Sequence, residues 1–438
     1  MINTKWLTTL TIVLLSTIAL PQTLPFHRAE RIENIDVHSF AGTMLLKHDV
    51  PGTFRKLPKN PIFQPGGMGW DSEDVSDPFI LQSGDSLMLF YSGSSRSDEQ
   101  YHIGYAVRDE TGWFWKKRDK IISGSGGAWD AFHQLSPIVL REPDRWLMIY
   151  SGNDEDSELG YETGVATSTD GKNWQYYVKN PVLPSQPGFW DASGQIYGDI
   201  VFLPETGEYR LYYTGFQGPF SSIGLATSSD GINWQHSGEQ PVFSRLPGVI
   251  APDVIYNGET WQMFFVQAVI GEKGMGTKIC RATSPDGIKW GEPEDILQPT
   301  DRWEKGNLVR PQLVYMEGRM SLYYCGGSGR WQIGAATTVP VFRGSGSWLS
   351  NAIPKNATIF ELVYDQPYGT EISVSLQSGN RATPQPLSIE NALPTGRSQV
   401  FRAKIPLPET GTSNRKIELR FSTTDPSKSP VVYEMSVR

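Results

Sequence analysis

The chain has 438 residues, a formal net charge of -8 at pH 7, 44 glycines, 31 prolines and an aromatic content of 12%. This length allows two or three domains that each bury a core. The acidic balance excludes nucleic acid as the ligand, because phosphate backbones are bound by clustered Lys and Arg. The Gly, Pro and aromatic content favours many short strands and turns, and the charge suits a neutral, polyhydroxylated ligand.

Residues 1–20 form a separate unit at the N-terminus. Lys5 precedes an apolar stretch from Trp6 to Leu20, which is shorter than the roughly 20 residues that cross a bilayer. This pattern predicts a signal peptide cleaved near Ala19, and therefore a secreted or periplasmic protein with no membrane contact after cleavage. An uncleaved membrane anchor is the alternative. Residues 21–52 follow as an N-terminal extension.

Residues 53–341 contain a repeat with a spacing of 54 to 61 residues. Each unit opens with an apolar run at a Pro or Gly, called the anchor below, and continues with a run such as "LMLFYSG" and a run such as "IGLATS". A turn of the form "SxDGxxW" then leads to a fourth run, because Asp-Gly favours a hairpin. Five units of four antiparallel strands predict an all-β, five-bladed β-propeller. The anchors are Pro78, Pro137, Gly198, Pro252 and Pro311.

The fifth unit lacks a fourth run of its own. The segment "FRKLPKNPIF", from Phe54 to Phe63, matches the fourth run "WQYYVKNPVL" of the second unit. We therefore expect this N-terminal strand to pair beside residues 332–337 and close the ring, which protects an edge that an open array would expose. Residues 342–438 show five further runs between Pro-, Gly- and Ser-rich turns, and predict a small C-terminal β-sandwich that packs as an accessory or binds sugar.

The repeat also assigns the loops to two faces. In an antiparallel blade, the start of strand one, the end of strand two and the start of strand three lie on one side. We call this side the anchor face; the "SxDGxxW" turns lie on the opposite, turn face and are expected to be scaffold. A Trp-acid pair stands eight residues before four of the anchors, and four copies indicate a structural role in which the acid satisfies backbone donors. These acids are Asp71, Asp130, Asp191 and Glu304.

Residues that differ between equivalent positions are the candidates for function. Asp77 precedes the first anchor, and the equivalent positions in the other units are Ser136, either Tyr197 or Gly198, Ala251 and Arg310. Asp199 and Asp253 follow their anchors by one residue, and strand alternation places them on the same face as Asp77. Glu162 adjoins the third run of the second unit and is expected to point inward. The candidate substrate-binding residues are Trp70, His133, Gln195, Tyr197, Phe216, Arg310 and Trp331.

Convergent carboxylates beside aromatic side chains suit glycoside hydrolysis, which needs one acid and one base or nucleophile. We interpret Asp77 as the base or nucleophile and one of Asp199, Asp253 and Glu162 as the acid, although each acid taken singly also fits a hydrogen-bonded residue at a strand end. The expected partner is a carbohydrate. No cofactor is expected, and the sequence shows no cluster of residues with metal-ligand spacing. It leaves open whether a structural calcium or sodium ion is bound. The sequence does not predict the oligomeric state.

These segments resemble the five-bladed glycosidases of families 43 and 32 over about residues 53–340. The resemblance rests on "SDPFILQSGDSLMLFYSG", "APDVIYNGETWQMFFV" and "IGLATSSDGINW", and it implies a catalytic base or nucleophile at Asp77, in the first Asp-Pro. The second Asp and the acid Glu of those families have no match at the other anchors. The acid has therefore moved to another residue, or the chemistry differs. Arg310 and His133 leave room for phosphate-dependent cleavage, as in the related mannoside phosphorylases.

Three other points stay open on the sequence. A non-catalytic carbohydrate-binding propeller would keep the same fold. A sialidase-like enzyme is suggested by "SxDGxxW", but sialidases have six blades and three arginines, and this chain has five units and one central Arg. Cys280 and Cys325 either form a disulfide or pack as small apolar residues.

Overall fold

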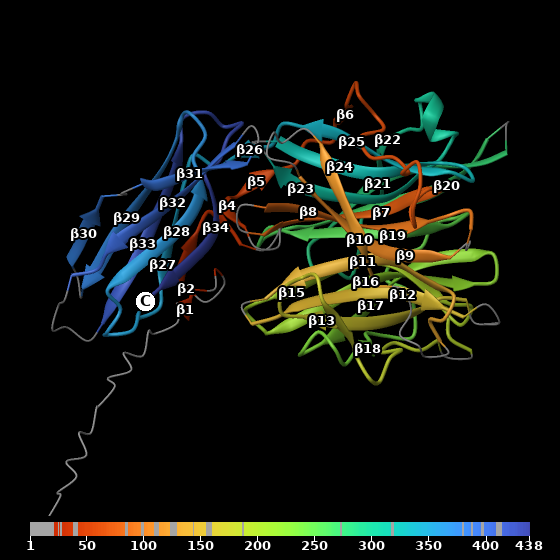
Figure 1. Ribbon diagram of the computed structural model, residues 1–438, viewed down its shortest axis with the longest axis horizontal. Coiled ribbons are helices and arrows are strands. Elements are labelled where there is room, and N and C mark those ends of the chain that lie inside the picture. Colours follow the sequence, from red (N-terminus) through yellow and green to blue (C-terminus); the bar gives the residue numbers. More distant parts are fainter. Residues whose placement is uncertain are drawn as a thin grey trace, which may run out of the picture.

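The computed structural model of the chain has two parts side by side (Figure 1). It describes residues 22–24, 26, 29–37, 43–83, 86–97, 100–108, 114–122, 129–142, 144–154, 160–185, 188–271, 274–316, 319–378, 381–386, 389–395, 398–408 and 414–438. The predicted signal peptide lies outside them. The described elements are strands and one 3-10 turn, η1 (Arg302–Glu304), which confirms the all-β prediction. In these ranges no helix has the length and apolar character needed to cross a membrane.

Five four-stranded antiparallel sheets make up the larger part, and their order follows the repeat. The first sheet contains β7 (Asp74–Ser83), β8 (Ser86–Ser94), β9 (Tyr101–Arg108) and β10 (Trp115–Ile122). The second contains β11 (His133–Arg141), β12 (Trp146–Asn153), β13 (Glu162–Ser168) and β14 (Trp174–Tyr176). The third contains β15 (Gln195–Leu203), β16 (Glu208–Gln217), β17 (Phe220–Ser228) and β18 (Gln235–His236).

The last two sheets follow the same order. The fourth contains β19 (Val249–Tyr256), β20 (Trp261–Gly271), β21 (Gly274–Ser284) and β22 (Glu294–Leu297). The fifth contains β23 (Leu308–Met316), β24 (Arg319–Gly327), β25 (Trp331–Thr338) and β6 (Arg55–Lys56). Lys56 pairs with Ala336 and Arg55 with Thr337, so β6 lies beside the strand that the sequence predicts as its partner.

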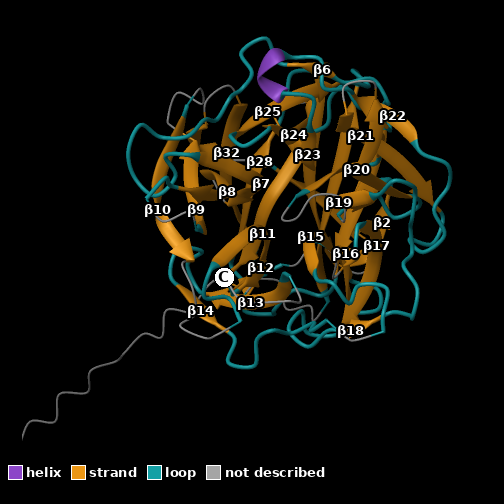
Figure 2. Ribbon diagram, turned by 90° about the vertical axis from the view of Figure 1, so that its right-hand side faces the viewer, coloured by secondary structure: helices purple, strands orange, loops and turns teal. Residues whose placement is uncertain are grey.

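The five sheets stand around a common centre. In Figure 2 the first strands β7, β11, β15, β19 and β23 lie near the middle, and the fourth strands lie at the periphery. This arrangement is propeller-like. We call the central region, formed by the first strands, the hub.

Each first strand carries a bulge at its anchor. The register between the first and second strands shifts there in all five sheets. The residue before each anchor has a positive φ, which side chains other than Gly rarely adopt: 51° for Asp77, 58° for Ser136, 49° for Tyr197, 54° for Ala251 and 56° for Arg310. Tyr197 is therefore the equivalent of Asp77. Pro suits the anchor because it leaves no unpaired N–H in the bulge.

The bulge also joins neighbouring sheets. In three of the sheets its backbone N–H donates to a small side chain on the second strand of the preceding sheet. The pairs are Asp77 to Cys325 Sγ at 3.1 Å, Ser136 to Ser92 Oγ at 2.9 Å, and Ala251 to Thr214 Oγ1 at 2.8 Å. Cys325 thus accepts the N–H of the bulge in the first sheet, as Ser92 and Thr214 do in the second and fourth sheets. Both cysteines are buried free thiols, which decides between the two alternatives in favour of packing.

The Trp-acid pairs hold four of the sheets together, and we call each unit a Trp-acid clasp. In the first sheet, Trp70 stacks on Tyr91 with 5.3 Å between ring centroids, and a Cβ built on Gly104 would lie only 2.3 Å from the Trp70 ring. Asp71 accepts hydrogen bonds from the Tyr91 hydroxyl at 2.9 Å and from the Lys117 ammonium at 2.6 Å. These contacts fit a structural role, but the donors to Asp71 are the side chains of Tyr91 and Lys117 and not the backbone donors that the sequence predicts.

Two larger sheets form the second part of the molecule. One contains β3 (Ile35–Asp36), β4 (Met44–Leu46), β34 (Val431–Val437), β28 (Ile359–Asp365), β32 (Ser398–Pro406) and β31 (Ile389–Thr395), with β1 (Gln22–Thr23) beside β34. The other contains β2 (Ala29–Glu33), β27 (Ser345–Ser350), β33 (Arg415–Thr423), β29 (Thr370–Ser378) and β30 (Arg381–Gln385). A short pair, β5 (His48–Asp49) with β26 (Val341–Phe342), adjoins them.

The N-terminal strands of this second part differ from the sequence analysis, which gives residues 21–52 no strand. β2 pairs with β27 and β4 pairs with β34, so segments from both ends of the chain build these sheets. The β4 residues are fully buried, but three apolar residues are too short a run to show the alternation that identifies a strand.

The second part lies against the turn face. Lys47 Nζ is 2.8 Å from Glu259 Oε1, which belongs to the turn between β19 and β20, and Arg281 donates to the Val50 carbonyl at 2.5 Å. In Figure 1 the larger sheets lie on the left, whereas the hairpin of β20 and β21 projects to the right. The anchor face is therefore turned away from the second part.

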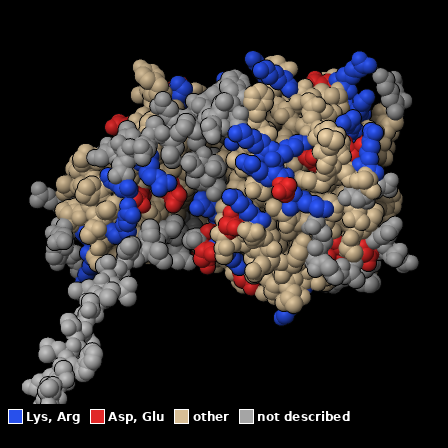
Figure 3. Space-filling view, viewed as in Figure 1, with Lys and Arg blue, Asp and Glu red and all other residues tan. Residues whose placement is uncertain are grey.

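The lateral side of the molecule that Figure 3 shows carries a group of Lys and Arg side chains over the middle of the larger part, where Figure 1 places β10. The β10 strand contributes Lys116, Lys117, Arg118 and Lys120. Lys117 belongs to the first clasp, and the other three are exposed. This basic side is separate from the anchor face.

Candidate active site at the hub

Asp77 lies at the hub, and its side chain is buried, with 4% of the residue exposed. Ser76 Oγ donates to Asp77 Oδ2 at 3.2 Å. Burial and the nearby Asp77 carboxylate raise the pKa of Tyr161 to about 12, and the same two causes raise the pKa of Tyr197 well above its usual value. Both phenols therefore stay protonated and can donate hydrogen bonds beside this carboxylate.

An aromatic wall stands next to Asp77. The Tyr101 backbone N–H donates to His133 Nδ1 at 3.1 Å, so Nε2 carries the proton of the neutral imidazole. Burial, followed by the charge of His102, lowers the pKa of His133 to about 4. The His133 ring lies 5.5 Å from the Tyr101 ring and 6.0 Å from the Tyr161 ring, between centroids. The wall offers ring faces and a fixed N–H donor.

Arg310 occupies the bulge position of the fifth sheet and is 3% exposed. Its Nη1 donates to the Gly198 carbonyl at 2.8 Å, and its guanidinium lies 5.7 Å from the centroid of the Tyr197 ring. Among the residues described here, Nε and Nη2 have no hydrogen-bond partner. A buried cation with two unused donors is costly unless an anion or carbonyl oxygen binds it.

Asp199 and Asp253 each join one sheet to the next. Asp199 Oδ2 accepts the Val254 N–H at 2.7 Å, and Asp253 Oδ2 accepts the Leu313 N–H at 2.9 Å. Gln312, at the same place after its anchor, accepts the Ile80 N–H at 2.7 Å. The three side chains therefore form a set of inter-sheet links, which alternation along the strand could not predict because the links cross between sheets.

The two linked carboxyl groups have raised pKa values. Burial raises the pKa of Asp199 to about 6, against the effects of its backbone hydrogen bonds and of Arg310. Burial and the charge of Asp199 raise the pKa of Asp253 well above its usual range. This pair therefore holds at least one proton at mildly acidic pH, which is a property that a general acid needs.

Glu162 makes none of its described contacts with Asp77. Glu162 Oε1 accepts the Ser185 N–H at 3.4 Å, and burial raises the pKa of Glu162. Its neighbour Tyr161 faces the hub instead, since its ring stacks against His133.

Four candidate binding residues have other surroundings. Trp70 lies inside the first clasp. Gln195 is fully buried, and its Nε2 donates to Asp191 Oδ2 of the third clasp at 2.9 Å. Phe216 is half-buried near the end of β16, where its backbone pairs with Ser221 and binds Gly194. The backbone N–H of Trp331 donates to Asp74 Oδ1 at 2.5 Å.

Sequence reasoning missed Asp74, Tyr101 and Tyr161. Asp74 Oδ2 accepts hydrogen bonds from the Tyr101 hydroxyl and from Ser94 Oγ, both at 3.1 Å, so it fixes the wall. A signal for the tyrosines was present. They stand three residues before the Gly of the third runs "YHIG" and "YETG", where the third unit has Ser221.

No protein-family model matches the chain. An uncharacterized protein of Mycobacterium tuberculosis strain H37Rv is 26% identical over 241 residues, which cover 51% of this chain and 79% of that protein. An A type blood N-acetyl-α-D-galactosamine deacetylase of Flavonifractor plautii is 29% identical over 131 residues, which cover 27% of this chain and 16% of that protein.

Several solved structures share the fold. A glycoside hydrolase has a TM-score of 0.56 at 17% identity, covering 66% of this chain and 94% of its own. A second structure has a TM-score of 0.53 at 17% identity, covering 66% of this chain and 96% of its own. It comes from the GH130 family of mannoside phosphorylases, which is said to contain glycoside hydrolases that target β-1,2 mannosidic linkages in Candida mannan. The β-1,2-mannobiose phosphorylase of Listeria innocua, in complex with β-1,2-mannobiose, has a TM-score of 0.51 at 13% identity, covering 65% and 96%.

These similarities show a glycoside hydrolase-like fold and nothing finer. Membership of families 43 and 32 stays a prediction, because no family model matches the chain. Within the described residues, no group of three or more His, Cys, Asp or Glu side chains is placed to hold a metal ion.

Proposed function

We propose that this protein is a carbohydrate-active enzyme, and specifically a secreted glycoside hydrolase with its active site at the hub. In this interpretation the five four-stranded sheets are the blades of one propeller that β6 closes, and the two larger sheets are a sandwich. The observation that carries the proposal is Asp77. It is the one carboxylate among the five bulge positions, and it lies buried beside protonated tyrosines.

The roles follow from the surroundings of each group. Asp77 acts as the base or nucleophile. Asp199 acts as the acid, because burial raises its pKa to about 6 and so keeps a proton available at mildly acidic pH. A sugar ring stacks on the wall of Tyr101, His133 and Tyr161, whose ring faces suit the apolar side of a sugar.

A second candidate is a phosphate-dependent glycoside phosphorylase. The observation in its favour is Arg310, whose buried guanidinium has two donors without a partner in the described structure. Arginine binds phosphate through such paired donors. Phosphate would then replace water as the attacking group, and the same hub would release a sugar phosphate.

The test is product release by the wild-type protein and by Asp77→Asn. Both are incubated with fructans, arabinans, xylans and mannosides, with and without phosphate, and free sugar and sugar phosphate are measured. Asparagine tolerates the left-handed backbone and keeps the size of Asp, so we expect turnover to fall by about 10³-fold or more with little change in Tm. A protein that binds these glycans but releases no product would instead be a non-catalytic sugar-binding propeller.

A further inference from the structure

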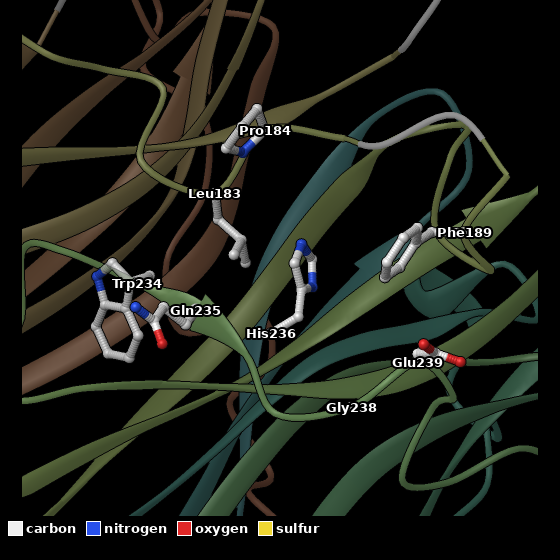
Figure 4. A pocket seen from close by; sticks show the side chains of 8 residues that line it. All are labelled: Leu183, Pro184, Phe189, Trp234, Gln235, His236, Gly238 and Glu239. Carbon is white, nitrogen blue, oxygen red and sulfur yellow. The ribbon is translucent and has the colours of Figure 1, made fainter.

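A cavity of about 390 Å³ lies away from the hub, beside the outer strands of the second and third sheets. Figure 4 shows the His236 ring between Leu183 and Phe189, with Gln235 and Glu239 also at the wall. Phe189 precedes the Trp-acid pair of the third sheet, and Leu183 forms a bridge with Thr163 near the start of β13. Trp234, which ends an "SxDGxxW" turn, also lines the cavity, so the cavity follows β18 along the outer side of the larger part and reaches the anchor face at Leu183 and Phe189.

His236 is the unusual member of this wall. Its Nδ1 lies 2.9 Å from the Tyr213 hydroxyl, which donates to Asp191 Oδ2 at 3.0 Å, so His236 completes the third clasp. In the first and fifth clasps the corresponding partner of the acid is a lysine, Lys117 or Lys56, at 2.6 Å.

Because His236 stands where the first and fifth clasps have a lysine, one nitrogen of its ring has no partner within the clasp. The His236 side chain is 10% exposed, and its Nε2 is buried with no hydrogen-bond partner in the described residues. A lysine in the clasp uses its ammonium on the acid, whereas an imidazole uses Nδ1 and keeps Nε2 for another group. Buried polar atoms without a partner are rare in proteins and indicate an unfilled interaction.

The lining of the cavity selects the class of ligand. Phe189 and His236 have ring centroids 5.8 Å apart, and Leu183 and Pro184 add apolar surface. The Gln235 amide and the Glu239 carboxylate offer a donor and acceptors for hydroxyl groups. A volume near 400 Å³ is at the small end of the usual range for ligand sites, roughly 300–1,000 Å³.

We propose that this cavity is a second, non-catalytic carbohydrate site that holds a neutral sugar ring against Phe189, and that the His236 ring turns on binding so that its buried Nε2 accepts a hydrogen bond from a sugar hydroxyl. The choice of a sugar rests on the proposed function, whereas the cavity and the free nitrogen do not. A glycan chain bound here would be held beside the anchor face, and the site would raise affinity for polymers more than for single sugars.

The experiment is a titration of Asp77→Asn protein, in which the hub does not consume the ligand. Manno-, xylo-, arabino- and fructo-oligosaccharides of about four units are added, and the histidine ring signals are followed by NMR. The His236 signal is assigned by its loss in His236→Lys. We expect a saturable shift of that signal with at least one of these oligosaccharides.

Two further variants, made in the same background, separate binding from folding. His236→Lys restores the lysine of the other clasps and should keep Tm; Phe189→Ala removes the ring surface. In calorimetry both should weaken the second binding event at least tenfold and leave any binding at the hub unchanged. The proposal is overturned if none of the oligosaccharides shifts the His236 signal, or if both variants bind as the parent does. Either result is independent of turnover by the wild-type hub, which tests the proposed function separately.

Discussion

In each of the four Trp-acid clasps, the acid accepts a hydrogen bond from the hydroxyl of a tyrosine on the second strand of its sheet. At the hub, by contrast, the five matching bulge positions carry five different side chains. The clasp acids accept hydrogen bonds of 2.9 to 3.0 Å from tyrosines, and lysine ammonium groups also donate to them in the first and fifth sheets. The hub leaves two Arg310 donors unused and keeps the pKa of Asp199 at about 6. Copied positions therefore maintain the fold, and divergent positions are free to carry chemistry.

The fourth sheet sharpens this comparison because it has no clasp. Phe265 stands in the place of the clasp tyrosine, and it pairs with Cys280, where Tyr91 pairs with Gly104 in the first sheet. Cys280 Sγ lies 3.5 Å from Gln267 Oε1, and Gln267 stands at the position of Gly93. Side chains on the strands thus fill the room that a Trp ring takes elsewhere.

The largest effect on stability is expected when the room for a Trp ring is removed. Gly104→Ala places a Cβ about as close as 2.3 Å to the Trp70 ring, so the ring must leave its position. We expect a loss of about 3 kcal/mol in the free energy of unfolding, measured by denaturant titration. Gly67→Ala, where the Cβ meets nothing within 4 Å, is the matched control and should have little effect. Equal stability of the two variants would contradict the packing role of Trp70.

A smaller loss is expected when one clasp hydrogen bond is deleted. The Tyr150 hydroxyl donates to Asp130 Oδ2 at 2.9 Å, and both groups are buried. Tyr150→Phe should cost about 2 kcal/mol in unfolding free energy, because it leaves a buried carboxylate with one donor fewer. Turnover at 25 °C should be unchanged, and a selective loss of turnover would move the clasp into the active site.

The reverse exchange tests the sheet without a clasp. Phe265→Tyr adds a hydroxyl where no Trp-acid pair precedes the anchor and where Phe265 itself is fully buried. We expect a loss of about 1 kcal/mol or somewhat more, since the new hydroxyl lacks the acid that accepts it in the other sheets. Stabilisation by this change would show that the fourth sheet already contains an acceptor.

The smallest effect concerns the pH dependence of stability at the hub. The raised pKa of Asp199 means that between about pH 4 and 6 the folded protein holds a proton that the unfolded chain releases. The stabilisation from this proton is complete below about pH 4 and is lost as the pH rises through 6. Asp199→Asn keeps the acceptor for Val254 and removes the titration. Tm curves of the two proteins that run parallel from pH 4 to 7 would contradict this pKa.

The repeat predicts much of the fold but less of the site. Spacing alone places the strands of the five sheets and pairs β6 with β25, because Asp-Gly turns and apolar runs act locally. Trp70 is a candidate substrate-binding residue in the sequence, although its ring packs on two glycines in the structure. The bulge and the inter-sheet links of Asp199 and Asp253 depend on contacts between sheets, which no single strand pattern contains. The tyrosines near Asp77 could have been found by comparing the third runs.

The central claim is that a divergent hub position carries the chemistry while the copied clasp positions carry the stability. It is tested most directly by measuring glycan turnover and Tm for Asp77→Asn and Asp130→Asn together, two buried aspartates changed to the same residue. We predict that Asp77→Asn loses turnover and keeps its Tm, and that Asp130→Asn keeps turnover at 25 °C and has a lower Tm. Wild-type turnover in Asp77→Asn, on a glycan that the unaltered protein cleaves, would contradict the claim.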